Sequence, residues 1–400
     1  MEDKVENKPV RVLIVDDSRT EQIMLSEILS ADPGISVIGT VDSGIAALNF
    51  IKRDCPDLIT MDLKMPDFDG LQVTRAIMER QPIPIIIVTV DHALTTAENA
   101  FKLLEAGAVG VVEKPFSFHP QQQQALSSQL CRLVRSLAKV KLVHRWPRSA
   151  SPSLLQSDPH LLLPIAKQAQ STASEPVEAK NSNSPKSTVT NLPYVAIEGS
   201  KAQLAHLKAN RKAIACIAIG ASTGGPPVLK HILDNLPAVL PVPIFIAQHM
   251  SPGFMEGFGH WLQKEMNHPL LIPAHGQKIE KGTVYLAPAG FHMLIDSSGS
   301  IVLKPRPDGD TSLKSVSSIF SSVAEHYGAS ALAILLTGMG SDGAQELREL
   351  RDCGAVTIAQ DENTSVVFGM PGIAVKLDAA QLVLSPEQIS EAINLLCQIS

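Results

Sequence analysis

Several residues that can do chemistry stand directly after short apolar runs, where a buried strand would end. Asp16 and Asp17 follow the run RVLIV, and Asp62 closes the run DLITMD. Much further along the chain, the run AIACIAIG leads into Ser222. Ligands of α/β proteins bind beyond the carboxyl ends of the strands. The spacing therefore predicts two chemistries in one chain: a carboxylate cluster that accepts a phosphoryl group, and a serine nucleophile.

The acidic residues suit a phosphoacceptor site. Crowded carboxylates repel one another unless a hard cation neutralises them, and oxygen ligands from Asp16, Asp17 and Asp62 suit Mg²⁺. With Mg²⁺ bound, the Asp62 carboxylate can attack a phosphoryl group and form an acyl phosphate. Thr89 ends a later apolar run and Lys114 follows the next one. We therefore expect a hydroxyl and an ammonium group to reach the same phosphoryl oxygens.

The serine lies in the sequence IGASTGGPP, between an apolar run and a helix-like pattern. Pro226 and Pro227 fall in the first turn of that pattern, where proline is tolerated. A serine on such a turn is exposed beside helix amides that can stabilise an oxyanion. His249 ends the run FIAQH, and Asp342 follows ALAILLTGMGS. If these strand ends converge, they supply a nucleophile, a base and an acid that orients the base.

Each of these residues also has a plainer interpretation. The acids can be loop caps and Lys114 a solvated surface residue. His249 can be a structural histidine, and Asp342 can cap the helix that follows it. The loop GASTGG can bind phosphate, although it lacks the lysine of a P-loop and does not match GxGxxG. The combination of residues at successive strand ends favours the two catalytic interpretations.

The apolar runs alternate with amphipathic segments in two parts of the chain. Five runs between residues 10 and 116 predict a parallel sheet that helices cover on both faces, as in a flavodoxin-like doubly wound domain. From about residue 213 the alternation resumes and predicts a second α/β domain. Between them lies a stretch rich in Pro, Ser, Gln, Asn and Thr, which predicts a mostly disordered linker. The predicted divisions are a first domain at 10–140, a linker at 141–210 and a second domain at 211–400.

Composition excludes several functional classes. The chain has 400 residues, a formal charge of -6 and a pI near 6.1, which gives no general attraction to nucleic acid or to acidic membranes. No apolar run approaches the roughly 18 residues of a membrane span, and the N-terminus lacks the pattern of a signal peptide. The five cysteines are scattered without CxxC spacing, which favours reduced thiols. We expect a cytoplasmic protein without direct insertion into the membrane.

Two stretches resemble known families. The first stretch, residues 10–120, resembles the response-regulator receiver domain. The resemblance rests on the motifs DD and MDLKMPDFDG, a later Thr and the pair KP. The second stretch, residues 213–398, resembles the chemotaxis protein-glutamate methylesterase family. The resemblance rests on three motifs in the order IGASTGGP, AQHM and LLTGMGSDGA, which follow a receiver domain in the chain. The resemblance implies a Rossmann-like α/β hydrolase domain that hydrolyses glutamyl methyl esters of chemoreceptors and often deamidates selected glutamines. The order Ser, His, Asp differs from the Ser, Asp, His order of ordinary α/β-hydrolases.

For the receiver, the resemblance implies that Asp62 is the phosphoacceptor and that a histidine kinase is the phosphodonor. Mg²⁺ would be bound by Asp16, Asp17 and Asp62 with the backbone carbonyl of Lys64. Thr89 and Lys114 would sense the phosphoryl group.

For the second domain, the resemblance implies that Ser222 attacks the ester, His249 carries the proton and Asp342 holds the imidazole. The backbone amide of Met339, with Thr223 nearby, would face the oxyanion. The esterase step would need no cofactor, and its substrates would be methylated chemoreceptor cytoplasmic domains.

Two stretches depart from the family pattern. Val111 stands where many receivers have an aromatic residue, and residues 304–320 read KPRPDGDTSLKSVSSIF instead of a sequence close to RPSVDVLF. Two alternatives therefore stay open beside the methylesterase. One is a phosphorylation-dependent binding module whose hydrolase domain has drifted, and the other is an esterase that acts on a protein outside chemotaxis.

Overall fold

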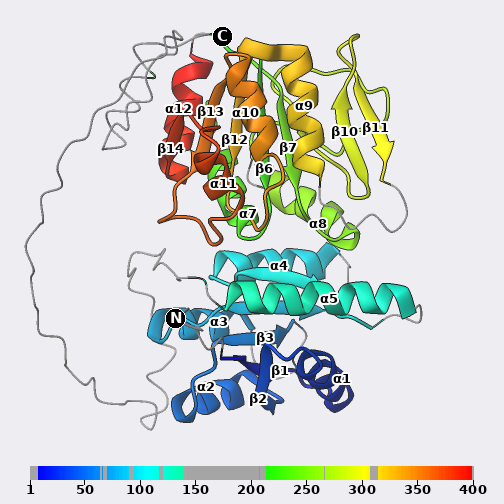
Figure 1. Ribbon diagram of the computed structural model, residues 1–400, viewed down its shortest axis with the longest axis vertical. Helices are drawn as coiled ribbons and strands as arrows, with labels where there is room; N and C mark the ends of the chain where they lie inside the picture. The colour runs from blue at the N-terminus through cyan, green and yellow to red at the C-terminus, as the bar shows by residue number, and fades with distance from the viewer. Residues whose placement is uncertain are drawn as a thin grey trace, which may run out of the picture. The chain divides into compact units, whose positions relative to one another are not determined.

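A computed structural model describes most of the chain, in two parts that each contain one parallel sheet (Figure 1). It describes residues 8–63, 65, 70–89, 94–116, 120–138, 140, 207, 213–264, 266–306 and 314–398. The predicted linker at 141–210 lies outside these residues except for Leu207, so its character stays a prediction.

The first part is a five-stranded parallel sheet in the order β2-β1-β3-β4-β5. This order is that of the flavodoxin-like doubly wound fold, as predicted. Its strands are β1 Val10–Val15, β2 Ile35–Val41, β3 Leu58–Asp62, β4 Ile85–Thr89 and β5 Gly110–Glu113. Its helices are α1 Arg19–Ser30, α2 Gly44–Arg53, α3 Gly70–Arg80, α4 Leu94–Glu105 and α5 Pro120–Leu137.

The central strands β1, β3 and β4 of this sheet are largely apolar and buried because helices cover both faces. In β1, Val12 and Ile14 join one apolar cluster, while Leu13 joins another on the opposite face. Helices α1 and α5 contact each other, and α3 contacts both α2 and α4. Beside β1, β3 pairs in parallel with Val15 opposite Met61. The residues that follow these strands therefore meet at one sheet edge.

The second part is a seven-stranded sheet in the order β14-β13-β12-β6-β7-β9-β8, with all its pairs parallel. Its strands are β6 Cys216–Ala221, β7 Ile244–Gln248, β8 Leu270–Leu271, β9 Val284–Leu286, β12 Ala331–Leu335, β13 Val356–Gln360 and β14 Leu382–Leu384. Its helices are α7 Gly225–Asp234, α8 Pro252–Gln263, α9 Ser315–Tyr327, α10 Ala344–Asp352, α11 Met370–Lys376 and α12 Pro386–Cys397, with a 3-10 turn η2 at Gly328–Ser330.

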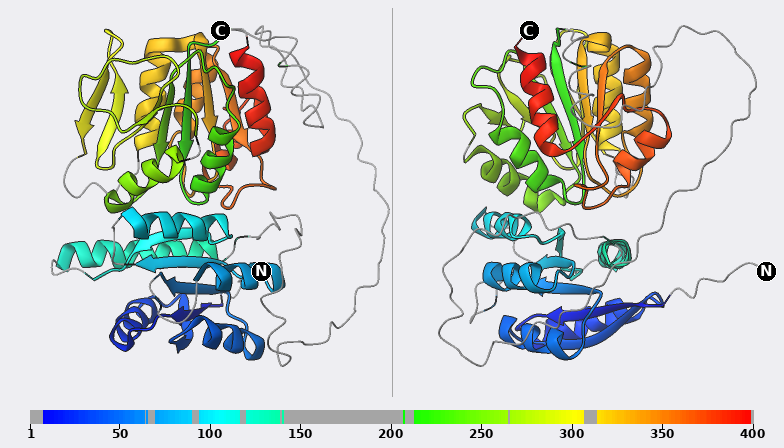
Figure 2. Two further views of the ribbon diagram at one scale, coloured as in Figure 1. Left: turned by 180° about the vertical axis from the view of Figure 1, so that it is seen from behind. Right: turned by 90° about the vertical axis from the view of Figure 1, so that its left-hand side faces the viewer.

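Helices cover both faces of this sheet as well (Figure 2). Helix α10 contacts α9 and α11 on one side, and α7 contacts α12 on the other. In β6, Ile217 and Ile219 pack into one apolar cluster, while Cys216 and Ala218 pack into the other. The prediction of two doubly wound α/β domains is thus confirmed at the level of the fold.

A two-stranded antiparallel hairpin was not foreseen from the sequence. Strands β10 Phe291–Ile295 and β11 Ile301–Pro305 pair with Phe291 opposite Pro305. The turn between them contains Gly299 at φ 69°, a left-handed conformation that favours glycine. The signal was present in the sequence, because DSSG separates two short apolar runs. Helix α9 packs against this hairpin, which lies beside the edge of the second part.

Within the described residues, none of the helices has the length and apolar character that a membrane span requires.

Candidate active site and carboxylate cluster

Ser222 lies on the turn between β6 and α7. Its amide donates to the carbonyl of Thr337 at 3.1 Å, and its carbonyl accepts from the amide of Gly225 at 2.8 Å. Gly224 caps the helix at φ 78°, and an added Cβ would lie 2.5 Å from Val366. Prolines occupy the first turn of α7, as predicted. The turn therefore needs a glycine with positive φ directly after Ser222 and Thr223.

His249 and Asp342 form a buried pair. The Nε2 atom of His249 lies 2.7 Å from Oδ2 of Asp342, and their side chains are 4% and 6% exposed. Asp342 also accepts from the backbone amides of Val316 and Ser317 at 2.9 and 3.0 Å, at the N-terminus of α9. Asp342 therefore caps α9. The alternative interpretation, in which Asp342 caps the helix that follows it in the chain, is wrong. The following helix α10 begins after Gly343, without a side-chain cap.

These contacts keep the Asp342 carboxyl ionised. Burial alone raises the pKa of this group, but the hydrogen bonds and charge of His249 and the amide of Ser317 outweigh burial. The pKa of Asp342 is therefore below its ordinary value. An ionised Asp342 accepts a hydrogen bond from the N–H at Nε2 of His249. This bond selects the tautomer in which Nδ1 carries the lone pair.

The serine and the histidine directly follow the neighbouring strands β6 and β7. Ala221 pairs with Gln248 in the register of β6 and β7, and the amide of His249 donates to the carbonyl of Ala221 at 3.0 Å. Strand β12 lies on the other side of β6, and Asp342 follows it. The Nδ1 atom of His249 is buried and has no hydrogen-bond partner among the described residues. The structure thus brings the three predicted residues to one edge of the sheet.

Three buried polar residues that hold this site were missed from the sequence. Gln248 donates through Nε2 to the carbonyls of Ser222 and His249, both at 2.9 Å. Thr337 donates to the carbonyl of Thr223 at 3.0 Å, and its amide donates to Oε1 of Gln360 at 2.8 Å. The sequence contained a signal for two of them. Gln248 and Gln360 each end a buried strand, where a polar side chain is unusual unless it is hydrogen-bonded.

The Met339 segment approaches the serine through Gly338. An added Cβ on Gly338 would lie 2.6 Å from Cβ of Ser222 and 2.4 Å from the sulfur of Met370. The amide of Gly338 donates to Val367, and its carbonyl accepts from the amide of Met370. The next residue, Met339, is 37% exposed. This close approach places the backbone of Met339 beside the serine turn.

The predicted carboxylates meet at the edge of the first sheet. One carboxylate oxygen from each of Asp16, Asp17 and Asp62 lies within 4.8 Å of the others. Asp16 and Asp62 are buried, whereas Asp17 is exposed. Three oxygen donors at this separation fit a hard cation such as Mg²⁺, whose ligands lie at roughly 2.0–2.1 Å from the metal. The carbonyl of Lys64, the fourth predicted ligand, lies outside the described residues.

Lys114 joins this cluster. Its ammonium lies 2.8 Å from Asp16 and 2.9 Å from Asp62, and it also pairs with Glu21. Burial lowers the pKa of Lys114, but these three carboxylates outweigh burial and raise it. Burial raises the pKa of Asp16, an effect that Lys114 only partly offsets. Glu21 was missed from the sequence, where it stands in the first turn of α1 without an apolar run before it.

The two other predicted receiver positions fall where expected. Thr89 is buried at the end of β4, and the amide of Lys114 donates to its carbonyl at 2.9 Å. Val111 is half-buried in β5, opposite Ile87. The structure therefore brings Thr89 to the same sheet edge as the carboxylates.

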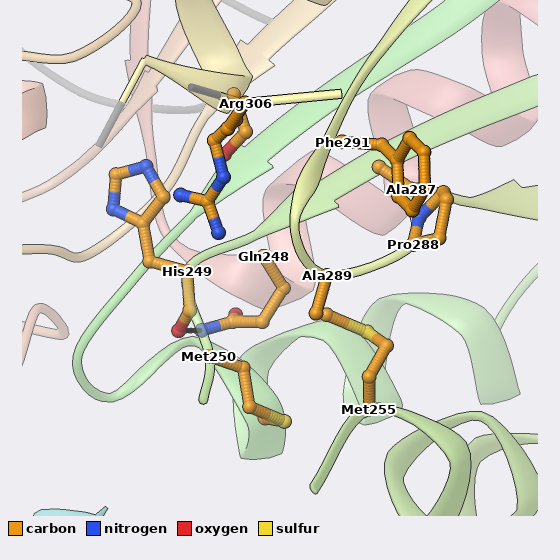
Figure 3. Close-up of a pocket in the computed structure, with 10 residues that line it drawn as sticks. Gln248, His249, Met250, Met255, Ala287, Pro288, Ala289, Phe291 and Arg306 are labelled. Carbon is orange, nitrogen blue, oxygen red and sulfur yellow. Dashed lines mark hydrogen bonds between the residues drawn. The ribbon is translucent and has the colours of Figure 1, made fainter. Parts of the chain in front are cut away.

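A small, partly open pocket lies beside His249 (Figure 3). Its walls come from the end of β7, the loop after β9, the end of the β10–β11 hairpin and the start of α9. The lining residues are Gln248, His249, Met250, Met255, Ala287, Pro288, Ala289, Phe291, Arg306 and Ser315. Most of them are apolar. Part of the atypical stretch 304–320 therefore borders the site, while residues 307–313 lie outside the described residues.

Comparison with known proteins agrees with both parts. Residues 12–125 match the family model of the response regulator receiver domain, and residues 217–393 match that of the CheB methylesterase. The chain is 40% identical over 384 residues to protein-glutamate methylesterase/protein-glutamine glutaminase 1 of Syntrophus aciditrophicus, which covers 96% of this chain and 97% of the relative. It is 39% identical over 387 residues to enzyme 4 of that name from Geobacter metallireducens, with 96% and 98% covered.

A solved structure is also similar. The crystal structure of the Thermotoga maritima CheB methylesterase catalytic domain is 32% identical, with a TM-score of 0.44, over 47% of this chain and 100% of that one.

Proposed function

The chain belongs to the protein-glutamate methylesterase/protein-glutamine glutaminase family, and we propose that Ser222, His249 and Asp342 carry out its ester hydrolysis. The enzyme is a methylesterase with a receiver domain, and phosphorylation regulates it. Its substrates are glutamyl methyl esters in the cytoplasmic domains of chemoreceptors. The observation that carries this assignment is the buried His249–Asp342 pair, whose remaining ring nitrogen has no partner among the described residues. The backbone of His249 is hydrogen-bonded to Ala221, the residue before Ser222.

The geometry supports a two-step reaction. Nδ1 of His249 accepts the hydroxyl proton of Ser222 as Oγ attacks the ester carbonyl, and the imidazolium is stabilised by Asp342. The tetrahedral intermediate collapses, the bond to the methoxy group breaks, and His249 returns the proton to the departing methanol. Water then attacks the acyl enzyme, again with His249 as base, and releases a glutamate carboxylate and the serine. Deamidation of a glutamine follows the same steps with ammonia as the leaving group.

The developing oxyanion needs hydrogen-bond donors. Among the described residues, the backbone amides of Thr223 and Met339 donate to no other group. Both lie beside Ser222, Thr223 directly after it in the chain and Met339 through the close approach of Gly338. We therefore assign these two amides to the oxyanion. Donors fixed in a closed turn stabilise such charge without reorganising during the reaction.

The carboxylate cluster provides the regulatory step. We assign Asp62 as the phosphoacceptor, because its buried carboxylate adjoins Lys114 and two further carboxylates. Mg²⁺ bound by Asp16, Asp17 and Asp62 would neutralise these groups and draw a phosphoryl oxygen towards Asp62. Lys114 then pairs with the new phosphoryl charge, and the hydroxyl of Thr89 donates to it. The phosphodonor is a histidine kinase.

Methanol release by the purified full-length protein tests the serine assignment. A chemoreceptor cytoplasmic domain that carries glutamyl methyl esters serves as substrate, with and without a small-molecule phosphodonor. Ser222→Ala is expected to lower the rate by several orders of magnitude, because the covalent nucleophile is lost. Phosphorylation of Asp62 should be unchanged in this variant.

Ser298→Ala provides a matched control, since Ser298 lies in the exposed turn of the hairpin. It should release methanol at the wild-type rate. Near wild-type release by Ser222→Ala would contradict the serine mechanism and leave the family assignment intact. An intact, hydrogen-bonded His249–Asp342 pair also gives no support to a drifted hydrolase domain that only binds.

A further inference from the structure

Arg306 is the one formally charged side chain in the lining of the pocket beside His249. It directly follows β11, and its amide donates to the carbonyl of Gly290 at 2.9 Å, which fixes the end of the hairpin. Phe291, at the start of β10, lines the same pocket. Figure 3 shows the guanidinium of Arg306 pointing into the pocket. The hairpin therefore delivers one cation and one aromatic ring to the approach of the active site.

No carboxylate neutralises this cation within the described part of the chain. The pocket lining contains neither Asp nor Glu. Asp342, the proposed catalytic acid, is already engaged by His249 and by two amides of α9. Among the described residues, the Arg306 guanidinium makes no ion pair or hydrogen bond. A half-buried guanidinium beside methionine, alanine and proline side chains is thus available to an anion from outside.

The surroundings strengthen such an interaction. Apolar walls lower the effective dielectric constant, so the attraction between two opposite charges is stronger here than on an open surface. A guanidinium also presents a planar fork of donors that matches a carboxylate in two parallel hydrogen bonds. The reacting methyl ester is uncharged. An anion that meets Arg306 must therefore come from a neighbouring position of the substrate chain.

Building on the proposed esterase function, we propose that Arg306 determines specificity by binding a carboxylate that flanks the esterified glutamate in the substrate. The preferred substrate is then an acidic segment in which the methyl ester has unesterified Glu or Asp neighbours. The remaining pocket wall, from Met250 to Phe291, takes the aliphatic part of that segment. Arg306 does not touch the reacting atoms, so it acts on recognition and not on the proton transfers at His249.

Two synthetic peptides test this proposal with the full-length protein. Each carries one glutamyl γ-methyl ester, flanked by Glu residues in one peptide and by Gln residues in the other. Methanol release gives kcat/KM for both. The wild-type protein should prefer the acidic peptide by about tenfold, which corresponds to a charged hydrogen bond partly screened by solvent. Added salt should reduce this preference.

Four variants separate the pocket contact from general charge. Arg306→Gln should bring the ratio of the two kcat/KM values close to one by slowing the acidic peptide, with the neutral peptide within about twofold of wild type. Arg306→Lys should retain part of the preference, because the charge remains without the planar fork. Arg306→Glu should reverse it. Lys304→Ala removes an equal charge from the exposed end of β11 and should keep the wild-type ratio.

The outcomes distinguish this proposal from the esterase function on which it rests. If the wild-type protein hydrolyses neither peptide nor methylated receptor, the esterase function fails. If it hydrolyses both peptides and Arg306→Gln leaves their ratio unchanged, the role of Arg306 is overturned while the esterase function stands. An equal loss on both peptides would also overturn it, because Arg306 would then support the fold or the catalytic residues. A ratio that falls equally in Lys304→Ala would assign the preference to general surface charge.

Discussion

At the scale of single residues, the site depends on which atoms of His249 are engaged. Nε2 is committed to Asp342, and Nδ1 has no partner among the described residues. The imidazole can therefore exchange a proton only at Nδ1, on the side away from Asp342. Asp342 has two roles, because the same carboxylate orients the imidazole and caps α9.

Asp342→Asn should affect catalysis and stability together. The amide cannot stabilise the imidazolium and favours the wrong tautomer, so methanol release should fall by a factor on the order of 10³–10⁴. The substitution should also lower the free energy of unfolding at pH 7 by about 1–3 kcal/mol, since a buried charged hydrogen-bond acceptor is lost. Urea unfolding and methanol release measure the two effects.

The stability effect has a defined pH dependence. The folded-state pKa of Asp342 is lowered, so its contribution is full above the unfolded value of about 3.9 and is lost as pH falls through the folded value. The difference in stability between wild type and Asp342→Asn should therefore shrink as the pH falls below about 4. A difference that grows towards acid pH would contradict the ionised, hydrogen-bonded state.

At the scale of elements, the site is built from the carboxyl ends of adjacent strands and from the loop after β12. This loop comes close to Ser222 at Gly338, which has no side chain. Gly338 permits this approach, since a Cβ there would overlap both Ser222 and Met370. Both neighbours are fixed: Ser222 by its bond to Thr337, and Met370 by its bond to the Gly338 carbonyl.

Gly338→Ala should therefore displace the Met339 segment from the serine. We expect methanol release to fall by about two orders of magnitude, comparable to the loss of one oxyanion donor. KM should change less than kcat, because the oxyanion exists only in the transition state. Gly259→Ala is a matched control, since Gly259, like Gly338, has no positive φ, and its Cβ would lie 3.5 Å or more from the nearest side chains. Equal losses in both variants would point to a general effect of the added methyl group instead of displacement of the Met339 segment.

At the scale of the whole molecule, two sheets carry two different chemistries. The carboxylate cluster supplies oxygen ligands for a hard cation, whereas the Ser222 site consists of a serine, a histidine and one acid that is already saturated with hydrogen bonds. Phosphorylation adds about two negative charges beside Lys114. If phosphorylation of Asp62 changes the rate of ester hydrolysis, a structural change at the first sheet must therefore affect the site on the second sheet.

Chelation should separate the two chemistries. Removing Mg²⁺ with EDTA is expected to abolish phosphorylation of Asp62 by a small-molecule phosphodonor, because the crowded carboxylates lose the cation that offsets their charge. Basal methanol release should stay within about twofold of its starting rate, since the proposed triad contains no metal-ligand set. A loss of basal release that Mg²⁺ restores would show that the esterase step also depends on the metal.

Regulation can be tested by removing the phosphoacceptor. Asp62→Asn should leave the full-length enzyme at its basal rate and unresponsive to the phosphodonor, because an amide cannot form the acyl phosphate. Deleting residues 1–205 should raise the basal rate if the unphosphorylated receiver restrains the esterase. Methanol release by both variants and by wild type gives the comparison. Equal basal rates for the truncated and full-length proteins would rule out restraint and assign the receiver to activation or localisation.

Much of this protein could be predicted from the sequence, because buried parallel strands leave continuous apolar runs and reactive residues directly follow them. The two doubly wound sheets were predicted in this way, and so were the positions of Asp62, Ser222 and His249 at the ends of strands. The hairpin β10–β11 was missed because only part of each strand is buried, so its apolar pattern is weaker than that of the buried parallel strands.

Only the tertiary structure decided the roles that depend on contacts between distant segments. Asp342 caps α9, whose first residues precede it by more than twenty positions, and no local pattern announces that bond. Glu21 reaches Lys114 from the first turn of α1. Arg306 enters the pocket beside His249 because the hairpin folds back along α9. Local sequence fixes where strands end, but the packing of helices and hairpins around those ends determines which other side chains arrive there.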